Sequence, residues 1–180
     1  MHEETLIPQV VAVCTSNGGI PKLPQSLACV SFAGFAGDEH NHAKHNNLLQ
    51  AVSLQDEEVL EDLIKEDFYL KPGTTGENLV VRHLRVNHLE AGTILEFSGG
   101  VILELTKDRK PCYVLDSIDP RLKEVIIGRC GFYAKVLREG LIEAGEIIQV
   151  RETAKARVLR ACPGATTRKY IKQYLLASFY

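Results

Sequence analysis

The sequence predicts a mainly β protein, a closed or nearly closed β-barrel with a few short α-helices. Three observations predict this fold class. Short apolar runs rich in β-branched residues recur along most of the chain, glycine-rich turns separate them, and few segments show helical spacing. Many short strands joined by tight turns are typical of barrels, because closure removes exposed sheet edges.

In the first half of the chain, Val10–Cys14 is a β-branched run that predicts the opening strand. The turn signal Asn17-Gly18-Gly19 follows it, and Ala28–Phe32 has the composition of a second strand. A helix is predicted to start at Ser53 as N-cap and to end at Lys71-Pro72-Gly73. Its leucines recur at helical spacing while its acids face outward, which is the pattern of a surface helix.

From there on, most signals are those of strands. The predicted strands of the second half are Asn78–Val81, Ile94–Phe97, Val101–Thr106, Phe132–Leu137 and Ile147–Val150. Ser98-Gly99-Gly100 lies between the second and third of these and predicts a hairpin. Asp119-Pro120 opens a short helix through Ile127, since proline in a first turn loses no needed hydrogen bond.

Length and composition predict one globular domain with a short appendage. The chain has 180 residues, of which 45% are hydrophobic and 24% charged. We expect a β-barrel domain over residues 1–150 and a basic, helical extension over residues 151–180, which hold seven basic residues and one acid. No dense basic run or nucleic-acid motif is present, so a nucleic-acid partner is not expected.

The cysteines and the N-terminal residues indicate a cytoplasmic protein. Five cysteines at wide, irregular spacings, with no Cys-x-x-Cys pair, predict neither a disulfide framework nor a zinc ribbon. No apolar run approaches the ~20 residues that span a membrane. The acidic start of the chain differs from a secretory signal. We therefore expect no membrane partner, and an oligomer is compatible with the sequence.

Cys112 is the first candidate for chemistry. It ends the segment Lys107-Asp108-Arg109-Lys110-Pro111-Cys112, in which three cations favour the thiolate, the form that attacks an electrophile or binds a metal. Pro111 interrupts a strand ladder, so the sulfur is predicted at the rim of the barrel, where ligands enter. The alternative is a partly buried structural cysteine at a strand end.

A second candidate is the polar segment Gly37–His45. It brings three imidazoles, His40, His42 and His45, within reach of the carboxylates of Asp38 and Glu39. Such groups can bind a metal or transfer protons, but the spacing is not that of a helical zinc motif. We expect a loop that lines a ligand site and does not ligate metal. The alternative is a solvated loop in which Asp38 bonds nearby amides.

Two further segments could hold an anion. Pro72–Leu79 contains two glycines and two threonines, and its backbone N–H groups could receive a phosphate, although the Gly-Lys-Ser/Thr of a P-loop is missing. An ordinary turn into a strand would explain this composition equally well. Arg129, Lys135 and Arg138 supply cations for an anionic ligand, or they are solvated charges beside a hairpin.

Taken in order, four blocks of the chain resemble the MOSC domain, the C-terminal module of molybdenum-cofactor sulfurases. They are Gly34–His40 with His45 and Gln50–Ser53, Lys71–Leu79, Ala91–Thr93 with Leu103–Thr106 and Lys110–Cys112, and Gly131–Gly140 with Gly145-Glu146. The resemblance covers about residues 10–150 and is closest to small stand-alone bacterial members.

The resemblance implies a barrel of the MOSC and pyruvate-kinase type. It also implies a molybdenum cofactor, molybdopterin-Mo, whose metal Cys112 ligates. The cofactor-binding residues that it implies are Asp38, His40, His45, Gly76, Glu77, Asn78, Lys110, Lys135 and Arg138. No flavin, haem or Fe–S motif is present, so the reductant of such an enzyme is expected to be an electron-donor protein.

Three functions follow from the resemblance and the thiolate chemistry. The first is a small molybdenum-dependent oxidoreductase acting on N-hydroxylated or similar compounds. The second is a sulfur carrier in molybdenum-cofactor or metal–sulfur cluster biosynthesis, with a persulfide on Cys112 supplied by a separate cysteine desulfurase. The third is a non-catalytic binding module. Molybdenum or a persulfide in the isolated protein would separate them.

Overall fold

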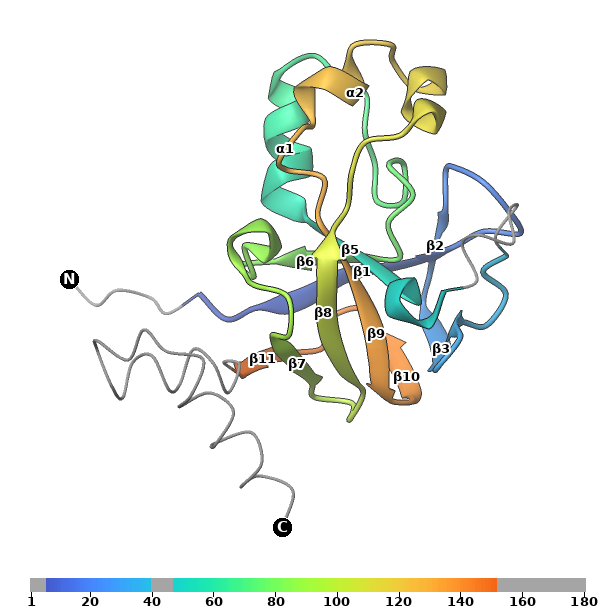
Figure 1. Cartoon of the computed structure of the whole chain (residues 1–180), viewed down its shortest axis with the longest axis vertical. Helices are drawn as coiled ribbons and strands as arrows, with labels where there is room; N and C mark the ends of the chain where they lie inside the picture. Colours follow the sequence, from blue (N-terminus) through green and yellow to red (C-terminus); the bar gives the residue numbers. More distant parts are fainter. Residues whose placement is uncertain (1–5, 40–46, 152–180) are drawn as a thin grey trace, which may run out of the picture.

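The computed structural model describes residues 6–39 and 47–151, and within them the protein is mainly β with two α-helices (Figure 1). The strands are β1 Gln9–Thr15, β2 Leu23–Gln25, β3 Leu27–Ser31, β4 Gly34–Phe35, β5 Val52–Asp56, β6 Leu79–Arg82, β7 Ile94–Phe97, β8 Ile102–Asp108, β9 Phe132–Arg138, β10 Gly140–Glu143 and β11 Ile148–Arg151. The helices are α1 Glu57–Lys65 and α2 Leu122–Val125, and short 3₁₀ turns include η3 Val86–His88 and η4 Tyr113–Ser117.

The strands form two sheets. Eight strands make one sheet in the order β11-β7-β8-β9-β5-β6-β1-β2, and β10-β3-β4 form a second sheet of three. An isolated bridge joins Gln9 at the start of β1 to Ile147 just before β11. The mainly β prediction is confirmed. The predicted barrel is not confirmed, because within the described residues only this isolated bridge, and no paired strands, joins β1 to the β11 end of the large sheet, and β10 pairs with β3 instead of extending it.

Both boundaries of the first predicted helix were wrong, and α1 ends at Lys65 rather than at Lys71-Pro72-Gly73. Ser53 lies inside β5, which pairs with β6 in parallel and with β9 antiparallel, and the helix begins only at Glu57 with Asp56 as its N-cap. All five residues of β5 are buried, including the polar side chains of Ser53, Gln55 and Asp56. The segment alternates apolar Val52 and Leu54 with polar Ser53 and Gln55, a strand pattern that competes with the helix N-cap signal of Ser53.

Two hydrophobic clusters stabilise this arrangement. One lies among the strands, and the other holds Leu60 and Leu63 of α1 together with Leu122 and Ile126 from the region of α2. Figure 1 shows α1 and α2 side by side at one end of the strands, with the β7–β8 turn at the opposite end. None of the described helices is long and apolar enough to cross a membrane. The helix expected over residues 152–180 lies outside the described residues.

Between β8 and β9 the chain leaves the large sheet and returns to it. Asp108 of β8 pairs with Phe132 of β9, and the 109–131 segment between them carries η4 and α2. This segment, which we call the cap, stands over the end of both strands in Figure 1. Cys112 belongs to the cap, so the position of the cap decides what lies beside the candidate thiol.

Candidate functional site

Cys112 is exposed and lies in an extended backbone immediately before η4. It follows Pro111, four residues after β8 ends at Asp108. The predicted position at the end of a strand is therefore correct. The alternative of a partly buried cysteine is wrong, because this thiol is open to solvent.

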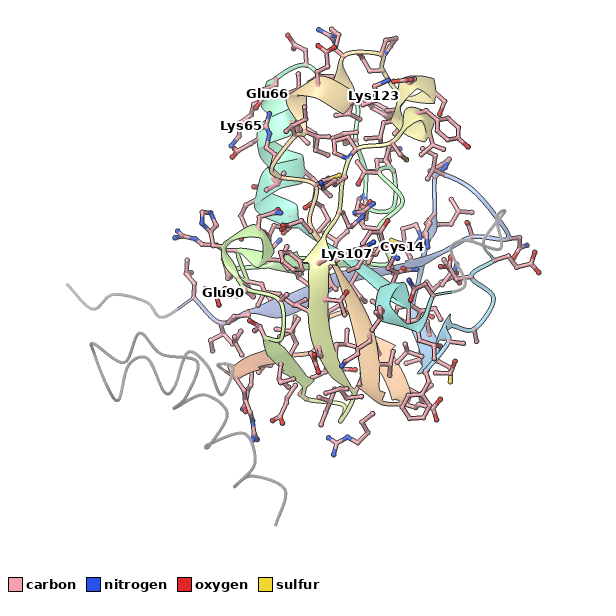
Figure 2. All side chains as sticks on the ribbon, in the orientation of Figure 1. Cys14, Lys65, Glu66, Glu90, Lys107 and Lys123 are labelled. Carbon is pink, nitrogen blue, oxygen red and sulfur yellow. The ribbon has the colours of Figure 1, made fainter. Side chains whose placement is uncertain are left out.

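A cavity of about 720 Å³ adjoins the two residues that precede Cys112. Its lining includes three cations, Arg109, Lys110 and Lys123, against two acids, Asp108 and Glu124. Lys123 bonds Asp116 outside the lining, at 3.0 Å. Figure 2 labels Lys123 in the cap and Lys107 at the end of β8 below it. A concave surface with three cations and two acids, whose lining includes the residue just before an exposed cysteine, can hold an anionic ligand.

Arg109 joins the cap to the rest of the site. Its backbone N–H donates to Gly131 O at 2.9 Å, and its guanidinium donates to Thr75 O at 2.8 Å and to Cys130 O at 3.1 Å. The guanidinium also lies 5.8 Å from the centre of the Tyr133 ring. Its Nε is buried and has no partner in the part of the chain that the structure describes. Arg109 therefore positions the strand end that carries Cys112 and keeps one unused N–H beside the cavity.

Asp38 and Asn78, 40 residues apart, meet in a buried polar network. Asp38 Oδ1 accepts from the Ser16 amide at 2.9 Å, while Oδ2 accepts from Asn78 Nδ2 at 2.8 Å and from the ammonium of Lys22. The alternative in which Asp38 bonds nearby amides is wrong, since the Ser16 amide is 22 residues away. Burial lowers the pKa of Lys22, and the bond to Asp38 opposes that shift.

Asn78 also holds three strands together. Its Oδ1 accepts from the backbone N–H and the hydroxyl of Ser53, at 3.1 and 2.9 Å. Its Nδ2 donates to Cys14 O at 3.2 Å. Strands β1 and β5 are thereby fixed where β6 begins. Asn78, which the family resemblance assigns to cofactor binding, thus also has a structural role.

The glycine loop before β6, residues 71–78, has backbone amides that are already hydrogen-bonded within the loop. Glu77 is fully buried and accepts from Gly73 N at 2.7 Å and from Thr75 Oγ1 at 2.6 Å. The amides of Thr74 and Gly76 donate to carbonyls of the same loop. A phosphate cradle would need such N–H groups unpaired. The geometry therefore favours the alternative of an ordinary turn, with the carboxylate of Glu77 in the place that an external anion would take.

Lys135 and Arg138 lie on β9, away from the cap. Lys135 pairs with Glu104 at 3.0 Å, and Arg138 donates to Gly100 O at the β7–β8 turn. Arg138 is six residues along β9 from Phe132, or about 20 Å at ~3.3 Å per residue. The structure does not bring Arg138 together with Cys112. His40 and His45 lie outside the described residues.

The other described cysteines divide into two buried and one exposed. Burial, reinforced by the charge of Glu77, raises the pKa of Cys14 to about 12. Burial likewise raises the pKa of Cys130, with the charge of Arg109 opposing it. Both belong to the hydrophobic cluster under the helices. Cys29 is exposed on β3, opposite Leu141 of β10, in the smaller sheet.

We expect iodoacetamide to alkylate Cys112 and Cys29 in the native protein and to spare Cys14 and Cys130. Both spared thiols are inaccessible, and their raised pKa values leave little thiolate at mildly alkaline pH. Peptide mass mapping after a short exposure would measure this, with urea-unfolded protein as the control. Rapid native labelling of Cys14 would contradict the buried arrangement described here.

Sequence reasoning missed the residues that act over long distances. Lys22 and Ser16 bond Asp38, and Arg109 reaches Thr75, yet none of these was singled out for such a contact. Lys22 had one available signal, a lysine between two prolines that hold the chain extended. A local sequence pattern could not predict that Lys22 bonds Asp38.

Comparison with known families gives a match over most of the described residues. The MOSC domain model matches residues 38–149, more than half of the chain. A protein of Gibberella moniliformis named reductase is 34% identical over 131 residues, which are 68% of this chain and 23% of that protein. The chain thus spans less than a quarter of that relative's length.

Solved structures show a similar fold. YuaD of Bacillus subtilis superposes with a TM-score of 0.67 at 18% identity, covering 81% of this chain and 96% of that one. YiiM of Geobacillus stearothermophilus gives 0.66 at 24% identity, over 81% and 75% of the two chains. YiiM of Escherichia coli gives 0.65 at 18% identity, over 83% and 71%.

Proposed function

The chain belongs to the MOSC domain family, and on that premise we propose that it binds a molybdenum cofactor through the thiolate of Cys112. The observation that carries the proposal is the exposed thiol beside a cavity with an excess of cations. Thiolate is a soft ligand suited to such a metal, and the cations suit the phosphate of a pterin cofactor.

The residues present fit that group. Cys112 would hold the metal, and Lys110 and Arg109 would face the anionic part of the cofactor. The buried, unpartnered Nε of Arg109, judged over the described residues, is an N–H donor that an anion at the cavity would satisfy. Asp38 and Asn78 support the strands behind the site and do not need to touch the ligand.

We propose further that the protein is a small oxidoreductase of N-hydroxylated or similar compounds. The cofactor would supply the two-electron chemistry, and a separate donor protein would supply the reductant. The Gibberella relative named reductase supports this class of reaction. Within the chain, the described residues would bind and orient the cofactor, and Pro111 would restrain the backbone that presents the sulfur.

The test is the molybdenum content of protein purified from a host that makes the cofactor. We expect near-stoichiometric molybdenum and oxidised-pterin fluorescence in the parent, and at least a roughly tenfold loss in Cys112→Ala, since the proposed metal–sulfur bond is gone. Cys29→Ala is the matched control, because Cys29 is also an exposed cysteine but lies on the smaller sheet.

Two results would overturn the proposal. Molybdenum retained by Cys112→Ala would remove the cysteine from the site. Absence of molybdenum from all three proteins, with a one-sulfur mass increment on Cys112, would instead identify a persulfide carrier that depends on a cysteine desulfurase.

A further inference from the structure

A second cavity, of about 850 Å³, lies between the start of α1 and the loop that follows β6. Its charged lining includes Asp56, Glu58, Asp62, His83, Arg85 and His88. It shares only Asn87 and Gly128 with the cavity beside Cys112, so it is a separate feature with a different, acid- and histidine-rich character. We call it the Asp56 cavity.

Asp56 stands at the N-cap position of α1 but does not cap the helix with its side chain. Its carboxylate turns to the neighbouring loop, where Oδ2 accepts from the Val86 amide at 2.7 Å. Asp56 is only 4% exposed, and its Oδ1 is buried and makes no hydrogen bond within the described residues, although the Asn87 amide also acts on this carboxylate and lowers its pKa. A carboxylate oxygen buried without a donor is costly, so its retention needs a reason.

Glu58, in the first turn of α1, repeats the pattern. Its Oε1 accepts from the His83 amide at 2.7 Å and lies 3.1 Å from His83 Nδ1. Its Oε2 is buried, and no donor for it occurs in residues 6–39 or 47–151. Each of the two carboxylates thus uses one oxygen to hold the loop and has a second acceptor without a partner.

The loop itself is held in a strained conformation. His83 and Arg85 have φ of +61° and +52°, in the left-handed region that costs a non-glycine residue about 1 kcal/mol or more. The bonds from Val86 and His83 to the two carboxylates keep the loop in that form. The loop and the two carboxylates are therefore tied together along one part of the cavity lining.

We propose that the Asp56 cavity binds a protonated amine, whose ammonium group donates to Asp56 Oδ1 and Glu58 Oε2. An ammonium carries three N–H donors, which two unpartnered acceptors in the lining of one cavity can use. The described residues offer no group of three side chains placed to hold a metal ion, which favours a donor ligand over a cation held by coordination.

Two other charged residues of the lining, Arg129 and Asp62, are already engaged, whereas Arg85 makes no ion pair with the described residues and leaves one cation in the lining. Both terminal nitrogens of Arg129 donate hydrogen bonds to the Glu66 carboxylate at 2.7 Å, and the Asp62 carboxylate accepts from the Lys65 ammonium at 2.9 Å. The unused acceptors of the cavity therefore concentrate on Asp56 and Glu58. This inference is independent of the proposed cofactor, and either proposal can fail alone.

The experiment is calorimetric titration of the full chain at neutral pH with n-butylamine, and with n-butanol as the uncharged probe. We expect the amine to bind and the alcohol not to. Asp56→Asn and Glu58→Gln should each weaken amine binding about tenfold or more, because each removes a charged acceptor. Asp62→Asn is the matched control: it removes an acid of the same lining that already has a partner, and should change binding less than about twofold.

Three results would overturn the proposal. The first is the absence of heat with butylamine in the parent. The second is an equal weakening of amine binding by Asp62→Asn, which would indicate that binding depends only on the overall negative charge of the cavity. The third is carboxyl NMR showing that Asp56 and Glu58 share a single proton at neutral pH, since the two oxygens would then satisfy each other. Circular dichroism of each variant would separate loss of binding from loss of folding.

Discussion

Gly131→Ala is expected to destabilise the protein by about 3 to 5 kcal/mol. Gly131 has φ of +84°, and an added Cβ would lie 1.9 Å from Leu54 O and 3.1 Å from Gln55 Oε1. The backbone cannot move aside freely, because its N–H donates to Asn87 Oδ1 at 3.2 Å and its carbonyl accepts from Arg109 N at 2.9 Å. The glycine is required where the cap rejoins β9.

Urea unfolding would measure this loss, with Gly128→Ala as the matched control. Gly128 also has a left-handed φ, +79°, but an added Cβ there would meet nothing within 4 Å. Gly128→Ala should cost only the strain of placing an alanine in the left-handed region, about 1 kcal/mol. Equal losses in the two variants would show that the close approach to Leu54 does not limit the packing of the cap.

Asp56→Asn is expected to change how stability depends on pH. Burial, reinforced by the charge of Glu58, raises the pKa of Asp56 from 3.8 to about 6, while the amide of Val86 opposes the shift. A carboxyl whose folded pKa exceeds its unfolded value binds its proton more tightly in the folded state. Its contribution to stability is full below about pH 4 and is lost as the pH rises through about 6.

Asparagine does not titrate, so the free energy of unfolding of Asp56→Asn should rise relative to that of the parent as the pH rises. A pKa difference of about two corresponds to a change of up to about 3 kcal/mol between the two proteins from acidic to neutral pH. Urea unfolding of both proteins across that range checks it. A constant difference at all pH values would mean that Asp56 is ionised equally in the folded and unfolded states.

Cys112 gains its surroundings from segments far apart in the sequence. Arg109 ties the end of β8 to Thr75 of the glycine loop and to Cys130 at the end of the cap. The three cations near Cys112 were predicted from spacing, but the structure uses them differently. Lys107 lies 5.6 Å from the Tyr133 ring, Arg109 is bonded to carbonyls, and Lys110 lines the cavity.

Several strands were predictable from local pattern. The runs at Val10–Cys14 and Phe132–Leu137, and the hairpin around Ser98-Gly99-Gly100, carry β-branched residues and turn signals that act within a few residues. Strand β5 alternates apolar and polar residues too, but Ser53 followed by the acids of the helix also matches a helix N-terminus, and the local pattern did not decide between the two. Strand β10 was missed too, since Gly140–Glu143 pairs with a strand over a hundred residues away.

The sequence by itself determined the mainly β character, the family and the single cysteine on which the proposed chemistry depends, because these are written in local composition and in the order of four short blocks. Only the tertiary structure decided which polar groups meet. Asp38 with Asn78, Arg109 with Thr75, and Asp56 with Val86 are contacts across 30 residues or more. Such contacts depend on how the strands and the cap pack, and hydrophobic periodicity along the chain carries no record of them.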